Sequence, residues 1–581
     1  MEYKSQNVVC QNCKTQFTIE PDDFGFYEKI KVPPPTWCPE CRMMRRMTYR
    51  NERTLYKQNC DLCKKPTISM YNPENKYIIY CNECFNSDEW DPMEYGKEYD
   101  FAKPFFEQVA DLFKTIPRRA LYRDFDVNSE YTNQSVYMRN SYLCFGGHHY
   151  EDSAYCAQNF MLKNCLDVDF SSDCEFCFDS LYLRKCFRVR FGYFSENCID
   201  SWFLYDCHNC QNCIGCTGLR NKSNCIFNKQ YTKEEYDNEI KELGLSNPEN
   251  LEKIKNEFWK NTLKFPRKYA NIKNAVSSTG DNLEQVRNCK YVFSVSGAEN
   301  IRYAFFMPYG GGKDCFDLDH VGMGSTEDYE LHSAFGDNRV YFSHRVYYSH
   351  NIEYSDDVYN SENIFACAGL RKKSYCILNR QYSKEEYEKL VQKIKEQMDE
   401  MQFVDKKGRV YKYGEFFPFE IIPFAYNESV VHEYFPLTKE EILERGYKYK
   451  EPEGKNYKPT ILPSQLPPID KADDKILQEI VQCEHVGRCN QKCTFAFRII
   501  QNELNLSKVL NIPLPNLCPN CRHMERIKIM NQPRLYHRKC MCKDQNHGHL
   551  DIECPSEFET SYAPERPEII YCEKCYNQEV Y

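Results

Sequence analysis

One stretch of the chain occurs twice, and this duplication constrains the fold more than any other feature. Residues 216–236 read CTGLRNKSNCIFNKQYTKEEY, and residues 367–387 read CAGLRKKSYCILNRQYSKEEY, so the copies align without a gap. The ends of the chain also repeat, because residues 38–60 are similar to residues 518–540. Such internal repeats indicate stacked or duplicated structural units. The chain therefore consists, in order, of a cysteine module, two repeat regions and a second cysteine module.

Length, charge and cysteine content limit the class of protein. The length of 581 residues predicts about four domains. The net charge of −9 argues against a protein that coats nucleic acid with its whole surface, although local basic patches remain possible. No N-terminal apolar segment and no run of ~18 apolar residues occurs, so we expect no signal peptide, no membrane span and a cytoplasmic location. In a reducing cytoplasm, the 34 cysteines indicate metal sites rather than disulfides.

Residues 1–90 contain two sets of paired cysteines, each suited to one zinc ion. Four thiolates can close a tetrahedral zinc site, and each C-x2-C pair supplies two of them from one turn. Phe17 and Ile19 alternate as in a hairpin strand, and the segment after Cys41 is predicted to be a helix. Free buried cysteines, or ligands interleaved between the two metals, are the alternatives. The predicted ligands are Cys10, Cys13, Cys38 and Cys41 for the first site, and Cys60, Cys63, Cys81 and Cys84 for the second.

The sequence also carries two resemblances. Residues 10–46, CQNCKTQFTIEPDDFGFYEKIKVPPPTWCPECRMMRR, resemble the small treble-clef family named "probable zinc-ribbon". That resemblance implies zinc bound by the four cysteines of the first site. The segments PPPTWCPEC, RNERTLYK, LRNKSNCIFNKQYTKEEY and YFPLTKEEILERGYKY are similar to those of uncharacterised zinc-ribbon proteins from small-genome candidate-phylum bacteria. The second resemblance spans nearly the whole chain and implies zinc modules, but no activity.

Residues 91–245 form the first repeat region, where the cysteines change character. Many are separated by nine or twelve residues, and most follow Asn or Asp, as in Asn164-Cys165. Asn and Asp tolerate the left-handed conformation at a turn, so the small residue that follows can point inward. Two such steps predict coils of ~18–24 residues, as in a parallel β-solenoid. Thr232 and Glu235 form a capping-box pattern, which predicts a helix that covers the open end.

The repeat-region cysteines could instead bind a metal cluster, an alternative favoured by CHNCQNCIGC at residues 207–216. The second copy argues against it, because the duplication aligns Cys210 with Ser361 and Cys213 with Ile364. An isoleucine cannot replace a thiolate ligand, but it can replace a buried thiol that packs as a small hydrophobic group. We therefore expect these cysteines to pack in the core and both repeat regions to be free of metal.

The middle of the chain completes the predicted layout. Residues 246–288 are predicted to form a helical connector, and residues 289–402 a second solenoid region whose capping helix begins at Ser383. Residues 403–482 are rich in proline and predict an extended linker that packs along the repeats. The expected fold is mainly β with little α, with two parallel β-solenoid regions and helical caps, flanked by duplicated treble-clef or zinc-ribbon modules.

Residues 483–581 repeat the N-terminal module with changes. His547, His549 and Cys554 compete as ligands of the fourth site, and Cys483 and His485 are further candidates near the third. Together the two modules predict about four Zn²⁺ per chain. The predicted ligands are Cys489, Cys493, Cys518 and Cys521 for the third site, and Cys540, Cys542, Cys572 and Cys575 for the fourth.

Three classes of function are consistent with this layout. The favoured hypothesis is a non-enzymatic scaffold that binds RNA or a ribonucleoprotein, because basic zinc modules often contact phosphates. The alternative interpretation of the basic residues is a solvated helix face, or arginines paired with acidic repeats. A protein-interaction or self-assembling protein is the second hypothesis. A β-helix enzyme is the third, but we assign no catalytic residue, because the acids at 167, 169, 173 and 179 lack a paired base. The predicted RNA contacts are Arg42, Arg45, Arg46, Arg50, Arg53, Arg522, Arg526 and Lys528.

Overall fold

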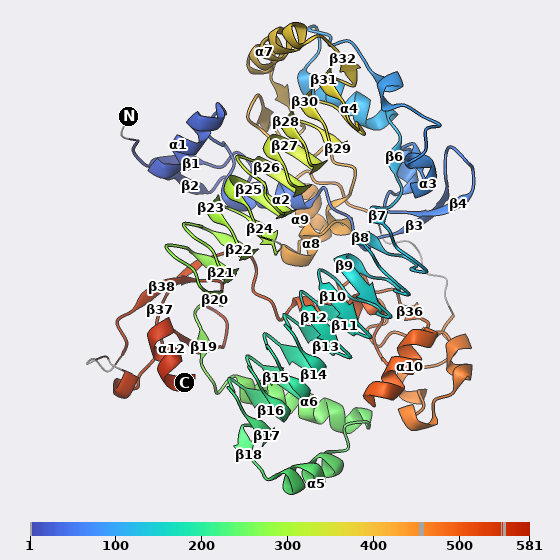
Figure 1. Ribbon diagram of the computed structural model, residues 1–581, viewed down its shortest axis with the longest axis vertical. Helices are drawn as coiled ribbons and strands as arrows, with labels where there is room; N and C mark the ends of the chain where they lie inside the picture. The colour runs from blue at the N-terminus through green and yellow to red at the C-terminus, as the bar shows by residue number, and fades with distance from the viewer. Residues whose placement is uncertain (1–2, 309, 452–457, 548, 550–552, 581) are drawn as a thin grey trace.

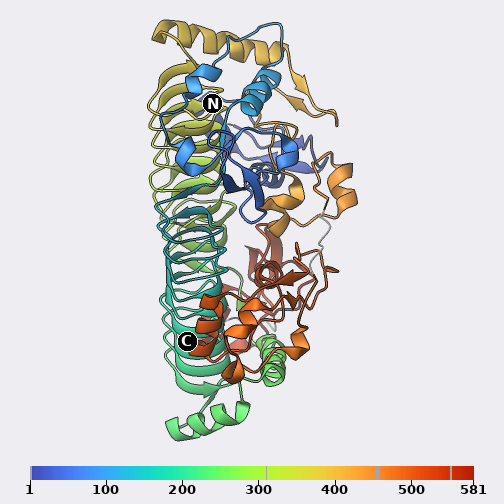
Figure 2. The same ribbon diagram turned by 90° about the vertical axis from the view of Figure 1, so that its right-hand side faces the viewer.

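The chain folds into an elongated molecule with a column of stacked strands along one side (Figures 1 and 2). The computed structural model describes residues 3–308, 310–451, 458–547, 549 and 553–580. The column contains two stacks of parallel strands, which we call the first stack (residues 123–226) and the second stack (residues 272–377). The stacks overlap at mid-length, where Arg184 of the first forms an ion pair of 2.8 Å with Glu284 of the second.

Parallel pairing at a spacing of twelve residues builds the first stack. Phe160 pairs with Ser172, and Phe187 pairs with Ile199, so the chain completes one coil every twelve residues. The predicted coil of ~18–24 residues is therefore too long. The strands are β7 (Arg123–Asp124), β8 (Asn133–Val136), β9 (Phe145–Glu151), β10 (Phe160–Lys163), β11 (Leu166–Asp169), β12 (Ser172–Glu175), β13 (Phe178–Leu181), β14 (Phe187–Tyr193), β15 (Ile199–Tyr205), β16 (Gln211–Thr217) and β17 (Ser223–Ile226).

A three-residue backbone pattern explains the short coil. Asn164, Asp167, Phe170 and Asp173 all adopt the left-handed conformation, with φ between 51° and 55°. Each of these corners turns the chain, and the residue that follows faces the interior, as the buried Cys165 does. Four corners at three-residue intervals close one coil of twelve residues.

Cysteine thiols and serine hydroxyls make the same hydrogen bond to the backbone inside the coils. Cys165 Sγ donates a hydrogen bond to the carbonyl oxygen of Lys163 at 3.3 Å, and Ser171 Oγ donates to that of Asp169 at 2.9 Å. In the second stack, Cys315 Sγ donates to a carbonyl oxygen in the same way, at 3.1 Å. A narrow interior needs small side chains that satisfy the backbone carbonyl groups, and both residue types do so. These contacts support core packing as the role of the repeat-region cysteines.

The second stack repeats this architecture with coils of unequal length. Ile272 pairs with Leu283 eleven residues later, Glu299 with Lys313 fourteen residues later, and Phe316 with Tyr329 thirteen residues later. Its strands are β20 (Ile272–Lys273), β21 (Gly280–Glu284), β22 (Val292–Ser296), β23 (Glu299–Arg302), β24 (Phe305–Met307), β25 (Lys313–Gly322), β26 (Tyr329–Phe335), β27 (Asn338–Tyr347), β28 (His350–Glu353), β29 (Asp356–Tyr359), β30 (Glu362–Phe365) and β31 (Ser374–Ile377).

Helices cover the outer end of each stack. Helix α5 (Lys233–Leu243) follows the short strand β18 (Lys229–Gln230), and α7 (Lys384–Glu400) follows β32 (Arg380–Gln381). Thr232 closes the predicted capping box, and Ser383 closes an equivalent one at the start of α7. Each hydroxyl oxygen accepts the backbone N–H three residues later at 3.2 Å. Helix α6 (Pro248–Thr262) then returns along the first stack before β19 (Arg267–Lys268) begins.

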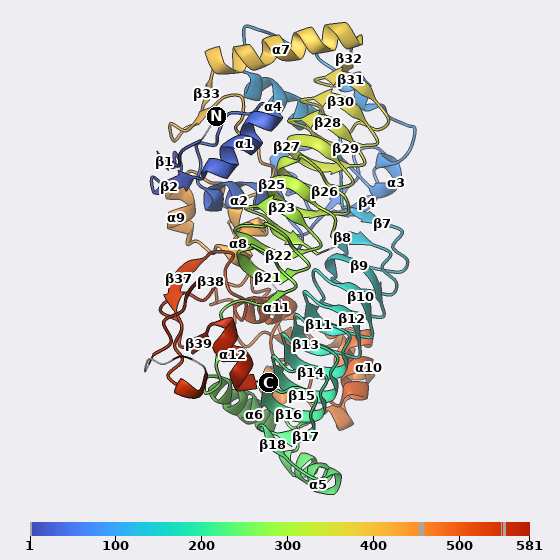
Figure 3. The same ribbon diagram turned by 60° about the vertical axis from the view of Figure 1, so that its left-hand side comes forward.

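The terminal modules lie one above the other beside the column (Figure 3), and Arg534 of the C-terminal module forms an ion pair with Glu40 of the N-terminal module. Helix α2 of the N-terminal module contacts β25 of the second stack, whereas α11 of the C-terminal module contacts β11 of the first. The N-terminal elements are β1 (Gln6–Val9), β2 (Gln16–Ile19), α1 (Pro21–Ile30), α2 (Pro39–Met47), β3 (Tyr56–Asn59), β4 (Pro66–Ser69), β5 (Ile79–Tyr80), α3 (Asn82–Phe85), α4 (Phe105–Thr115) and β6 (Arg118–Arg119). The C-terminal elements are β35 (Val481–Gln482), β36 (Ala496–Phe497), α10 (Gln501–Leu510), α11 (Pro519–Ile527), β37 (Tyr536–Lys539), β38 (Glu557–Thr560), β39 (Ile570–Tyr571) and α12 (Glu573–Val580).

The segment between the second stack and the C-terminal module is more folded than its proline content predicts. Its first half contains β33 (Phe403–Val404), β34 (Val410–Tyr411), α8 (Val431–Tyr434) and α9 (Lys439–Glu444). Phe416 in this segment is fully buried against the core that includes α2. None of the helices in the described ranges is long and apolar enough to cross a membrane.

Candidate metal centres

The first cysteine cluster joins a hairpin turn to the start of a helix. Cys10 and Cys13 flank the turn between β1 and β2, and Cys38 and Cys41 open helix α2. Their four sulfur atoms lie within 4.8 Å of one another. The backbone N–H of Cys38 donates to Cys10 Sγ at 3.3 Å, which orients the helix end toward the hairpin. The structure thus brings the four predicted residues together.

The second cluster repeats this local design. Cys60 and Cys63 lie at the turn between β3 and β4, and Cys81 and Cys84 open helix α3. The N–H of Cys81 donates to Cys60 Sγ at 3.3 Å, as in the first cluster. The four sulfur atoms again lie within 4.8 Å of one another. Each cluster draws on its own two pairs, so these two clusters do not interleave.

The third cluster differs from the prediction in one residue, because Cys483 takes the place expected for Cys489. The sulfur atoms of Cys483, Cys493, Cys518 and Cys521 lie within 4.8 Å of one another. The N–H of Cys518 donates to Cys483 Sγ at 3.3 Å, the contact that Cys38 makes with Cys10. Strands β35 and β36 place Cys483 at the end of the hairpin, whereas Cys489 lies in the loop beyond it.

Cys489 remains close to the third cluster without being part of it. Its sulfur atom lies 3.6 Å from that of Cys521, and His485, Cys489 and Cys521 form a smaller group. The strand pairing identifies Cys483, because Val481 pairs with Phe497 as Val8 pairs with Phe17, and Cys483 and Cys10 each lie two residues after the paired valine. The longer loop of the C-terminal hairpin hides this equivalence from residue spacing alone.

The fourth cluster also differs from the prediction, because Cys554 replaces Cys542. Cys540, Cys554, Cys572 and Cys575 bring their sulfur atoms within 4.8 Å of one another. Cys540 follows β37 and its N–H donates to the carbonyl oxygen of Ser556 at 2.9 Å, so the paired hairpin returns to the metal site at Cys554. The insertion that contains Cys542 leaves this hairpin, and Cys542 Sγ instead lies 3.2 Å from His547 Nδ1.

The thiols of one cluster shift one another's pKa values, and this mutual effect favours a bound cation. Hydrogen bonding with Cys41 lowers the pKa of Cys13 to about 6, whereas the interaction with Cys10 raises the pKa of Cys38 to about 12. Ionisation of some thiols therefore opposes ionisation of their neighbours. A divalent cation removes this conflict, because it stabilises all four thiolates together. The part of the chain that the structure describes thus contains four groups of four cysteines that can bind metal ions.

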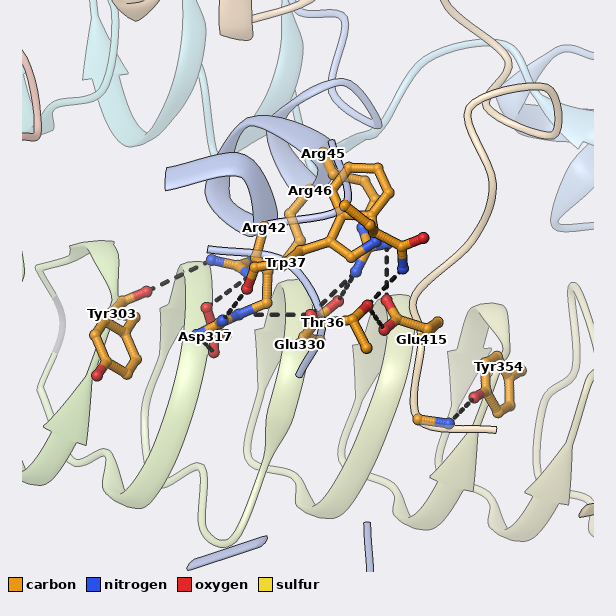
Figure 4. A network of polar contacts seen from close by, with 12 residues as sticks. Thr36, Trp37, Arg42, Arg45, Arg46, Tyr303, Asp317, Glu330, Tyr354 and Glu415 are labelled. Atoms are coloured by element: carbon orange, nitrogen blue, oxygen red, sulfur yellow. Dashed lines mark hydrogen bonds and ion pairs between the residues drawn. The ribbon is translucent and has the colours of Figure 1, made fainter. Parts of the chain in front are cut away.

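The basic residues of helix α2 do not face solvent, so the predicted RNA surface on this helix is wrong. Arg42 and Arg46 pair with Asp317 of the second stack at 2.8 and 3.0 Å, and Arg45 pairs with Glu330 at 2.9 Å (Figure 4). The three arginine side chains are at most 1% exposed. Side chains this deeply buried cannot contact phosphates. Nearby, Arg50 pairs with Glu52, and Arg53 is half-buried with its guanidinium 4.7 Å from the ring centre of Phe145.

Helix α11 repeats the arrangement on the first stack. Arg522 and Arg526 both pair with Asp167 at 2.9 Å, and Arg526 also reaches Asp169 at 2.7 Å. The alternative in which arginines pair with acidic repeats therefore describes both helices. Of the predicted RNA contacts, Lys528 has an exposed side chain, and it pairs with Glu525 of the same helix at 2.8 Å.

Comparison with known proteins assigns no family. No family model matches the chain, and no curated protein matches it. A solved structure named as an acetyltransferase from Desulfovibrio desulfuricans G20 is 9% identical over 40% of this chain and 62% of that chain, with a TM-score of 0.11. This likeness is too weak to bear on fold or activity.

Proposed function

We propose that the protein is a zinc-dependent, non-enzymatic scaffold in which metal modules clamp two β-solenoids. The observation that carries the proposal is the placement of helices α2 and α11. Each begins at a cysteine cluster and inserts arginines into buried carboxylates of a stack, as Arg46 does at Asp319 and Arg526 at Asp169. A metal bound at the helix start would therefore fix the helix that holds the stack.

Four properties of the clusters favour zinc in a structural role. All four ligands are thiolates, they arise from two turns, they are mostly buried, and each cluster is complete without a water ligand. Closed sites made of four cysteine thiolates are typical of structural zinc, whereas catalytic zinc keeps one position open. Such sites supply folding energy directly. We infer that the twelve-residue coils are turns of a β-solenoid and that the clusters belong to treble-clef and zinc-ribbon modules.

Thiol titration provides the test. A mercurial reagent that displaces metal from thiolates should release four zinc ions per chain, one for each cluster, as measured with a zinc-sensitive dye. Chelation should then expose helices α2 and α11 to limited proteolysis while the stacks resist cleavage. Release of fewer than three ions, or chelation that leaves both helices protected, would contradict the proposal.

A second candidate function is an assembly protein that binds an apolar protein surface through the first stack. The observation behind it is an exposed column of rings, in which Phe125 stacks on Tyr137 at 5.0 Å and Tyr137 on His149 at 4.9 Å. Phe125 is 71% exposed and Tyr137 is 49% exposed. Apolar groups aligned at the stack spacing form a flat surface, the type that protein partners cover.

A pull-down from the native host tests this second function. The Phe125→Ser/Tyr137→Ser variant should lose protein partners that are retained at moderate salt and after nuclease treatment, because an apolar contact is insensitive to both. The matched control is Tyr348→Ser, a change of an exposed ring on the second stack. Equal recovery of partners by both variants would argue against the aromatic surface.

A further inference from the structure

Four polar side chains form a column on the outer face of the second stack, beneath the N-terminal module. Asp319 on β25 pairs in register with His332 on β26, which pairs with His344 on β27, which pairs with Asp356 on β29. His320 packs beside the column, with its ring centre 5.2 Å from that of His332. All five side chains are buried.

Several polar atoms of this column lack a hydrogen-bond partner. Both ring nitrogens of His332, both of His320, Nε2 of His344 and Oδ1 of Asp319 are buried without one. A buried nitrogen or oxygen atom that has lost water and gained no partner is costly to the folded state. Such a concentration of unpaired donor and acceptor atoms indicates that something else binds there.

The internal duplication shows that the fold does not require imidazoles at these positions. In the first stack, Leu181 occupies the position of His332, and Tyr193 occupies that of His344, where these two residues also pair in register. Both residues are fully buried and belong to the hydrophobic core. The same twelve-residue coil is thus built with apolar side chains in one copy and with imidazoles in the other.

The hydrogen bonds around His344 leave one of its nitrogen atoms free to bind a ligand. Nδ1 of His344 lies 3.0 Å from Asp356, whose carboxylate is held by Arg118 at 3.0 Å and Arg345 at 3.2 Å. An ionised carboxylate accepts the Nδ1 proton, so Nε2 carries a lone pair. Carboxylates support metal-binding histidines in this way in many metalloproteins.

We propose that Asp319, His332 and His344 bind a divalent transition-metal ion, with His320 beside it as a fourth donor, which departs from the expectation that both repeat regions are free of metal. Two imidazoles and a carboxylate form a donor set that suits Zn²⁺, Fe²⁺ or Mn²⁺. The ring centres of His332 and His344 are 5.4 Å apart. Two imidazoles that share one tetrahedral ion place their ring centres roughly 5 Å apart, so small ring rotations suffice.

The surrounding charges are compatible with a cation. Arg46 binds Oδ2 of Asp319 and leaves Oδ1 free, and Arg50 has its own carboxylate partner in Glu52. Tyr49, just beyond helix α2, covers the column with its ring 5.1 Å from that of His344. The ion would therefore lie between the N-terminal module and the second stack, beneath Tyr49, and would be loaded as the module docks.

The test counts total metal in the intact protein, because loss of metal from the cysteine clusters would also free helix α2 from the column. Full-length protein refolded with excess Zn²⁺ and then desalted should hold one ion per chain beyond the four expected at the cysteine clusters. His332→Leu and His344→Tyr should lose it, and the duplicated stack shows that its coils accept both residues. The matched control His350→Gln changes an exposed histidine and should keep the ion.

Spectroscopy of the unmodified protein provides a measurement that does not depend on folding of the variants. Electron paramagnetic resonance after loading with Mn²⁺, which does not oxidise thiols, should show coupling to imidazole nitrogens. Absence of the additional ion, full retention of it by both histidine variants, or a bound-metal signal without nitrogen coupling would overturn the proposal. Failure of this proposal can be distinguished from failure of the scaffold proposal. The histidine substitutions change the ion at the column, whereas the number of thiolate-bound zinc ions does not depend on these histidines.

Discussion

Arg526 on helix α11 binds Asp169 on the first stack across 2.7 Å, with both side chains at most 1% exposed. Arg46 on helix α2 binds Asp319 on the second stack across the same distance, also in a buried pair. The two contacts are copies of one another, because both the modules and the stacks are duplicated. The module at each end of the chain holds the stack that is more distant from it in sequence order, so each pair links one half of the chain to the other.

Removal of Arg526 from its buried ion pair with Asp169 should destabilise the protein strongly. Arg526→Ala leaves the buried Asp169 with the imidazole of His523 alone and takes one of two arginines from Asp167. This loss should cost about 3–5 kcal/mol of the free energy of unfolding. Urea denaturation followed by circular dichroism measures this loss. Lys528→Ala on the same helix is the control, because its pair is exposed and should cost less than about 1 kcal/mol. Equal effects of the two substitutions would show that the buried pair does not anchor the helix.

The identity of the third cluster can be checked with two single substitutions. Cys483→Ser should remove one thiolate-bound zinc ion per chain, because its sulfur completes the group with Cys493, Cys518 and Cys521. Cys489→Ser should leave the zinc count unchanged. Mercurial titration of the purified variants gives both counts. Loss of zinc from the Cys489 variant alone would restore the ligand set predicted from spacing.

The sequence was most informative where a local rule decided the structure. Asn and Asp before cysteine predicted corners with inward-facing thiols, and the structure has Asn164 left-handed and Cys165 buried. The coil length could not be obtained from the same pattern. Phe170 and Tyr182 also occupy left-handed corners, although aromatic residues seldom adopt that conformation. The three-residue period was therefore hidden, and the nine- and twelve-residue cysteine spacing suggested a longer coil.

Long-range partners account for the main error about function. The arginines of α2 have the spacing of an exposed basic face, and only the folded chain shows that Arg42 meets Asp317 on the second stack. The predicted ligands of the third and fourth clusters were partly wrong for a related reason. Residue spacing favoured Cys489 and Cys542, whereas hairpin pairing over a longer loop brings Cys483 and Cys554 to the metal sites. In each case tertiary contacts outweighed the local signal.

Cys38 of the first metal cluster and Cys165 of the first stack should respond differently to replacement by serine. Cys38→Ser should abolish the first metal site, and each structural zinc contributes on the order of 10 kcal/mol to folding. Cys165→Ser should keep every metal and cost about 1 kcal/mol, because Ser171 and Cys165 make the same interior contact to a carbonyl oxygen. Zinc counting and urea denaturation distinguish the two outcomes. Zinc loss from Cys165→Ser would revive the cluster interpretation of the repeat-region cysteines.

Acid should weaken the contact between helix α11 and the first stack. Burial alone would raise the pKa of Asp169, but Arg526 and His523 outweigh burial and lower the pKa to about 2. The folded-state pKa is therefore below the unfolded value of ~3.9. A depressed carboxyl pKa stabilises the fold above the unfolded pKa, and that stability is lost as pH falls from about 4 to 2. The shift corresponds to roughly 2 kcal/mol for this fully buried group.

The acid effect can be separated from general acid denaturation with an asparagine variant. Asp169→Asn should be less stable than the parent at pH 7 and should lose less further stability between pH 5 and pH 2, because the titrating group is absent. Glu385→Gln, at an exposed position on helix α7, should follow the parent profile. Melting temperature across this pH range measures all three proteins. Parallel profiles for the parent and Asp169→Asn would show that the buried carboxylate of Asp169 does not govern acid stability, and that the ion pair with Arg526 contributes less than its geometry indicates.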